Sequence, residues 1–68
     1  MKYLIVIEKS KTGYSAYSPD VDGCVAAART RRAVERSMQG ALELHIEAMR
    51  AEGQPVPPPQ TTSTYVEV

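Results

Sequence analysis

The chain contains one cysteine, Cys24, and one histidine, His45, and this scarcity limits how its 68 residues can be stabilised. A chain this short buries only about 60% of the surface that its unfolded form exposes, so its core is thin. Small domains usually add disulfides, a metal ion or a partner subunit. Neither an intrachain disulfide nor a Cys/His zinc site can form here, so we expect no metal or other cofactor. We therefore predict self-association, with a homodimer as the simplest assembly.

The distribution of apolar and charged residues narrows the class of protein further. No apolar run reaches the roughly 20 residues needed to cross a bilayer, and the amino end has no signal-peptide cleavage pattern. With an unpaired cysteine, this favours a cytoplasmic protein without membrane association. Eight basic and eight acidic residues balance one another, whereas a nucleic-acid-binding domain usually has a dominant basic footprint.

The first 29 residues predict three short strands. Residues 2–9 are apolar on both alternating faces, which is typical of a strand in the interior of a sheet. We expect a turn at residues 10–13, where Gly13 can adopt positive φ, and a second strand at residues 14–18 that pairs with the first as a hairpin. Residues 19–23 are rich in turn formers, and residues 24–29 predict a third strand.

The middle of the chain predicts one long helix over residues 31–52. Thr30 is a suitable N-cap, and Gly53 and Pro55 end the helix. One stripe of apolar or neutral residues recurs at helical spacing, formed by Val34, Met38, Ala41, Leu42, His45 and Met49. Gly40 lies opposite this stripe, so packing on the domain's own sheet does not explain it.

The carboxyl end predicts a final strand. Residues 55–59 are nearly all proline and form a stiff extended connector, and residues 61–68 are β-branched and alternating. The whole chain is then one α+β domain, residues 1–68, of order βββαβ. We predict a four-stranded mixed sheet of order 3-2-1-4 with the helix on one face, the last strand lying parallel to the first through a right-handed crossover.

Three segments resemble the HicB-type antitoxins. They are the start YLIVI from Tyr3, the stretch YSAYSPDVDGCV from Tyr14 with Thr30 opening a helix, and the helix end ELHIEAMRAEG from Glu43 with PVP from Pro55. The family usually has proline where this chain has Asp22. The resemblance implies a truncated ribonuclease-H-like fold and a small basic RNA-cleaving partner, a HicA-like toxin. Many members carry a further DNA-binding segment. Because this chain ends at Val68, we expect no specific DNA binding.

Two groups of residues are candidates for contact with a partner. One lies in the second strand and the turn after it, where recognition residues often occur on loops, although a tight connection explains the same residues. The other is an arginine group at the helix start, which is either a solvated face or a patch for an acidic surface. The candidate partner-binding residues are Tyr14, Tyr17, Pro19, Asp20, Gly23, Arg29, Arg31, Arg32 and Arg36.

Two other functions compete with toxin neutralisation. The first is an orphan homo-oligomeric scaffold that regulates other partners. The second is a degenerate metal-dependent nuclease that uses clustered carboxylates, with Glu8, Asp20, Asp22 and Glu35 as the acids. We expect no catalysis, because Asp20 and Asp22 suit a turn, Cys24 has no adjacent base and His45 has no positioned second group.

Overall fold

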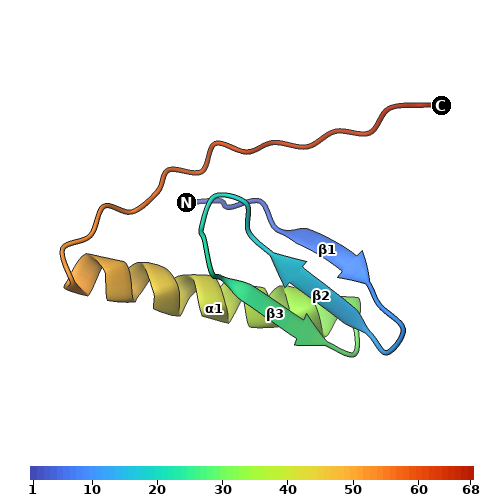
Figure 1. Cartoon of the computed structure of the whole chain (residues 1–68), viewed down its shortest axis with the longest axis horizontal. Helices are drawn as coiled ribbons and strands as arrows, with labels where there is room; N and C mark the ends of the chain where they lie inside the picture. Colours follow the sequence, from blue (N-terminus) through green and yellow to red (C-terminus); the bar gives the residue numbers. More distant parts are fainter.

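The computed structural model describes residues 1–68 as three strands followed by one helix (Figure 1). The strands are β1 (Val6–Lys9), β2 (Tyr14–Tyr17) and β3 (Val25–Ala28), and the helix is α1 (Arg31–Ala51). The strands form an antiparallel sheet of order β1-β2-β3, and α1 packs across one face of that sheet. The predicted α+β class, the hairpin and the single helix are confirmed.

The register of the sheet separates its residues into two faces. Ile7, Ala16 and Ala26 lie opposite one another across the three strands and face α1. One residue further along, Val6, Tyr17 and Val25 form the equivalent row on the face that the helix leaves open. The sheet therefore has one packed face and one open face.

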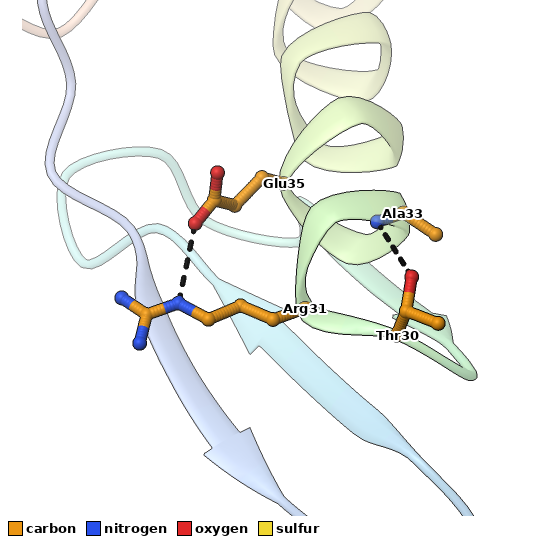
Figure 2. A network of polar contacts seen from close by, with 4 residues as sticks. All are labelled: Thr30, Arg31, Ala33 and Glu35. Atoms are coloured by element: carbon orange, nitrogen blue, oxygen red, sulfur yellow. Dashed lines mark hydrogen bonds and ion pairs between the residues drawn. The ribbon is translucent and has the colours of Figure 1, made fainter.

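Local sequence determines both ends of α1. The Thr30 hydroxyl accepts a hydrogen bond from the Ala33 amide at 3.1 Å, as predicted for an N-cap (Figure 2). At the other end, Gly53 has a φ of 72°, and the amides of Gly53 and Gln54 donate to the carbonyls of Arg50 and Met49. This pair of hydrogen bonds is a Schellman motif, which glycine forms without the strain that a side chain would cause.

The core is small and lies between α1, the sheet and the β2–β3 loop. It consists of six buried apolar residues, which are Ala16, Val21, Cys24, Val34, Met38 and Ile46. Of the predicted helical stripe, Val34 and Met38 are buried, and the other members are half-buried. The prediction left out Ile46, which is also buried. Ser18 is also buried, and its hydroxyl donates to the Leu4 carbonyl at 3.0 Å.

The fourth strand predicted at residues 61–68 does not form within the chain. After Gly53 the chain is extended and irregular, and every residue from 58 to 68 is exposed. In Figure 1 this segment leaves the end of α1, passes the amino-terminal residues and projects beyond the sheet. Without a neighbour on that side, β1 is an edge strand of four residues, and the prediction of an interior strand over residues 2–9 is wrong for the single chain.

Glycine is required at position 13 for a reason other than the predicted positive φ. Only Gly23 and Gly53 have positive φ, and Gly13 does not. Instead, a Cβ atom at Gly13 would collide with backbone atoms of Ala28 and Arg29. Glycine is needed here because the β1–β2 turn lies directly against the end of β3.

Candidate partner-binding surfaces

The open face of the sheet carries a row of apolar side chains that no element of the chain covers. Val6 is half-buried, whereas Tyr17 is 43% exposed and Val25 is 68% exposed. Cross-strand neighbours of this kind hold one another in fixed positions, so the row is a preformed contact surface. Tyrosine suits such a place because its ring is apolar and its hydroxyl can remain hydrated.

The loop between β2 and β3 adjoins one end of this face and is tied to the carboxyl-terminal segment. The Asp20 carboxylate accepts three hydrogen bonds, from the Gln60 amide at 3.1 Å, the Thr61 amide at 3.0 Å and the Thr61 hydroxyl at 2.6 Å. Nearby, the Tyr3 hydroxyl donates to the Pro57 carbonyl. The acceptors of Asp20 are therefore occupied by residues 40 and 41 positions away and not by the backbone of its own turn.

This arrangement predicts a pH dependence. The hydrogen bond from the Thr61 hydroxyl, followed by that from the Thr61 amide, lowers the pKa of the Asp20 carboxyl. The stabilisation of this contact is therefore complete above the unfolded-state pKa of about 3.9 and is lost as the pH falls through the lower pKa of the folded state. We expect the NMR signal of the Thr61 amide to titrate with a midpoint below about pH 3.9. The titration should vanish in Asp20→Ala and persist in Asp22→Asn, and a midpoint above the unfolded-state value would contradict the assignment.

The opposite end of the sheet is basic. Antiparallel pairing places the β1–β2 turn beside the start of α1, so six of the eight basic residues gather there: Lys9, Lys11, Arg29, Arg31, Arg32 and Arg36. Arg31 pairs with Glu35 at 3.3 Å on the exposed helix surface (Figure 2). The Lys9 ammonium lies over the Tyr14 ring, 5.1 Å from its centroid. The remaining arginines of this end form no ion pair.

The structure therefore divides the predicted partner-binding residues between two ends of the sheet. Tyr17, at the end of β2, lies with the loop residues Pro19, Asp20 and Gly23. Tyr14, at the start of β2, faces the packed side and lies with Arg29, Arg31, Arg32 and Arg36. The two tyrosines are on opposite faces, so no single flat surface contains all nine residues.

A groove between the amino-terminal residues and α1 was not predicted. It measures about 670 Å³, and its apolar part consists of Met1, Tyr3, Ile5, Leu42 and Ile46. Its other lining residues include three acids that recur along one flank of the helix, Glu35, Glu43 and Glu47. This helical spacing of acids is visible in the sequence, but the groove itself depends on residues 1–5 lying alongside α1.

Three isolated residues complete the description. Cys24 is buried, and burial raises the pKa of its thiol, which keeps the sulfur protonated and unreactive. His45 is half-buried on the apolar stripe. Gly40 is exposed, and a Cβ atom there would meet no atom within 4 Å, so the single chain does not require glycine at this position.

Comparison with known proteins shows the family. The family model described as "HicB_like antitoxin of bacterial toxin-antitoxin system" matches residues 3–68. The chain belongs to the HicB-like antitoxin family. The resemblance seen in the sequence is confirmed.

Relatives of known sequence and structure agree with this assignment. An uncharacterised 14.9 kDa protein from the rep–hol intergenic region of Haemophilus phage HP1 is 33% identical over 66 residues, which are 97% of this chain and 50% of the phage protein. A UPF0150 protein of Synechocystis is 38% identical over 81% of this chain and 71% of its own length. The chain thus spans half the length of the phage relative.

Two solved structures share both sequence and fold with this HicB-like domain. A chain of a HicA3 and HicB3 toxin–antitoxin complex superposes with a TM-score of 0.73 and 40% identity, covering 87% of this chain and 70% of that chain. The antitoxin HicB3 alone gives a TM-score of 0.73 and 38% identity over 88% of this chain and 44% of its own.

Proposed function

We propose that this HicB-like domain is an antitoxin that binds and neutralises a small, basic, RNA-cleaving toxin of the HicA kind. The observation that carries the proposal is the likeness, at 40% identity, to a chain of a complex between HicA3 and HicB3. Such a role requires binding and not turnover, so the domain needs an accessible contact surface and no reactive centre. The proposal includes a cytoplasmic location. No helix of the structure is both long and apolar enough to cross a membrane.

We place the toxin contact on the open face of the sheet. The Val6, Tyr17 and Val25 row is apolar, exposed and held by the strands, which favours tight association because little order is lost on binding. Pro19 and Gly23, on the exposed loop after β2, extend this surface at one end. The basic end, with its four arginines, is less suited to a basic toxin because like charges repel, so we assign it to an acidic partner surface.

Replacing Tyr17 with arginine tests this surface. A central aromatic residue often contributes more than about 1 kcal/mol to an interface, and a buried arginine facing a basic toxin adds repulsion. We therefore expect the dissociation constant for a HicA-like toxin, such as one encoded in a neighbouring reading frame, to rise at least about tenfold, measured by calorimetry. Protection of RNA from the toxin should fall in parallel.

Leu44→Arg provides the matched control. Leu44 is 72% exposed on α1, away from the open face, so the same charge should leave toxin affinity unchanged. Equal loss of toxin affinity in both variants, or no loss in Tyr17→Arg, would show that the toxin does not contact the open face. A neighbouring reading frame that encodes no such toxin would favour the orphan scaffold.

The same proposal holds that the domain has no catalytic activity, cofactor or specific DNA target. The four carboxylates considered for a nuclease are separated: Glu8 is in β1, Asp20 and Asp22 are in the β2–β3 loop, and Glu35 pairs with Arg31 on α1. No three His, Cys, Asp or Glu side chains gather as a metal site. Balanced charge offers no dominant footprint for DNA.

We also propose that the domain is a homodimer. The free edge of β1 and the groove beside it leave unpaired backbone and apolar surface against water, and soluble monomers rarely keep large patches of this kind. A four-stranded, truncated ribonuclease-H-like sheet would require residues 61–68 to find a partner edge. Dimerisation should make the melting temperature increase with protein concentration.

A further inference from the structure

The free edge of β1 continues into residues whose backbone is unpaired. The sheet register begins at Val6, and no backbone–backbone hydrogen bond involves residues 1–5. The only hydrogen bond that this backbone accepts is from the Ser18 side chain to the Leu4 carbonyl. Edge strands with open hydrogen-bonding groups are templates for another strand.

The groove lies directly beside this unpaired segment. Met1, Tyr3 and Ile5 form one wall of the groove, and α1 forms the other from Glu35 to Arg50. A strand added alongside residues 2–5 would place alternate side chains over the helix, where Leu42 and Ile46 offer apolar surface. The unpaired edge and the groove together have the features of a position for one more strand of the sheet.

The same chain has a carboxyl-terminal segment, residues 62–68, with the sequence pattern of a strand but no partner edge; we call it the tail. Residues 62–68 are β-branched and alternating, they make no backbone–backbone hydrogen bond, and Tyr65, Val66 and Val68 are exposed. Seven extended residues reach about 23 Å, and the radius of gyration of 13.2 Å exceeds the value of about 11 Å expected for a compact chain of this length. The tail therefore extends away from its own body.

The segment that connects α1 to the tail disfavours return of the tail to the β1 edge of its own chain. Residues 55–59 are stiffened by proline, and the contacts of Pro57 with Tyr3 and of Thr61 with Asp20 fix where the tail departs. A connection that does not carry an element back onto its own domain favours exchange of that element between copies. A fixed departure point also reduces the conformational freedom that is lost when the tail binds another molecule.

We propose that residues 62–68 of one copy add as a strand to the β1 edge of a second copy and occupy its groove, reciprocally in a symmetric dimer. This inference rests on the proposed homodimer and does not depend on toxin binding, which uses the open face. Two copies would then complete both four-stranded sheets at once, because each supplies one tail and one edge.

Charge determines which face of the tail enters the groove. Glu67 is the tail's one charged side chain, and three glutamates line the groove, Glu35, Glu43 and Glu47, against one arginine, Arg50. Repulsion keeps Glu67 outside, together with Tyr65 on the same face of the strand. Val66 and Val68 then point toward Leu42 and Ile46.

Directed disulfide formation tests the exchange. One chain carries Leu42→Cys and a second, separately purified chain carries Val66→Cys, and the two are mixed under mild oxidation. We expect a crosslinked heterodimer on a non-reducing gel, because a tail seated in the groove brings the two introduced thiols together. Buried Cys24 should not react. Leu44→Cys, on the exposed helix surface, is the matched control and should give at least about tenfold less crosslinked product with Val66→Cys.

Sedimentation of the unlabelled full chain provides a second measurement. Val66→Asp with Val68→Asp should raise the dimer dissociation constant at least about tenfold, because buried carboxylates would face the acidic groove. Toxin affinity should be retained, which separates failure of the exchange from failure of the antitoxin proposal. A crosslink confined to a single chain that carries both cysteines, or a dimer that the two aspartates leave intact, would overturn strand exchange. A monomer at all concentrations would do so as well.

Discussion

Replacing Met38 with alanine should leave the domain largely unfolded at room temperature. Met38 is completely buried beneath the sheet and is the largest fully buried side chain of the core. Truncating a buried methionine to alanine costs about 2–5 kcal/mol because apolar contacts are lost and a cavity remains. A core in a domain of this size rarely supplies more than about 3–5 kcal/mol, so one substitution consumes most of the free energy of unfolding.

Circular dichroism during urea unfolding would measure this effect at one fixed protein concentration, because the proposed dimerisation would make stability depend on concentration. Leu44→Ala is the matched control, because Leu44 lies on the same helix but is 72% exposed. It should change the free energy of unfolding by no more than about 0.5 kcal/mol. Equal destabilisation by both substitutions would show that the core is not centred on Met38.

Gly13→Ala should be the next most damaging change, although it adds only one methyl group. The new Cβ would meet the Ala28 carbonyl oxygen and the Arg29 Cα, which are backbone atoms and cannot rotate away. The β1–β2 turn and the end of β3 must then separate. Overpacking of this kind costs about 1–3 kcal/mol, which corresponds to a decrease in melting temperature of at least about 4 °C in a domain of this size.

The same substitution at Gly40 should have the opposite sign. Gly40 lies inside α1, and a Cβ there meets nothing within 4 Å. Alanine is favoured over glycine in a helix interior by about 1 kcal/mol, so Gly40→Ala should raise the melting temperature of the free domain. A decrease with Gly40→Ala, or no decrease with Gly13→Ala, would contradict these two assignments. A loss of toxin or dimer affinity in the stabilised Gly40→Ala variant would show that glycine serves close approach of a partner.

Local signals in the sequence predicted most of the elements. Thr30 and Gly53 marked the ends of α1 because capping depends on neighbouring residues, and the turn at residues 10–13 predicted the hairpin of the first two strands. Alternation in residues 61–68 predicted a strand equally well, but a strand also requires a partner edge. Local pattern cannot show whether that edge belongs to the same chain.

The candidate surfaces were less predictable for the same reason. The row containing Val6 and Val25 exists only through cross-strand register, and the contact of Asp20 with Thr61 joins residues far apart in sequence. Asp20 has the appearance of a turn residue in isolation. Only the family resemblance indicated a toxin as partner, and it did not indicate which face that partner contacts.

Positive and negative charges are separated along this small domain, so the electrostatic field that an approaching partner meets depends on which end it approaches. Helix α1, with 21 residues, is about 31 Å long and begins at the basic end, whereas Glu43 and Glu47 lie in its second half and Glu52 directly follows it. Ionic screening at physiological salt acts over about 8 Å, so the two ends do not sense one another through solvent. A formal net charge of zero therefore describes neither end. One end of the domain is positively charged and the other is negatively charged, so each end attracts a partner of opposite charge. Added salt should weaken the two attractions independently.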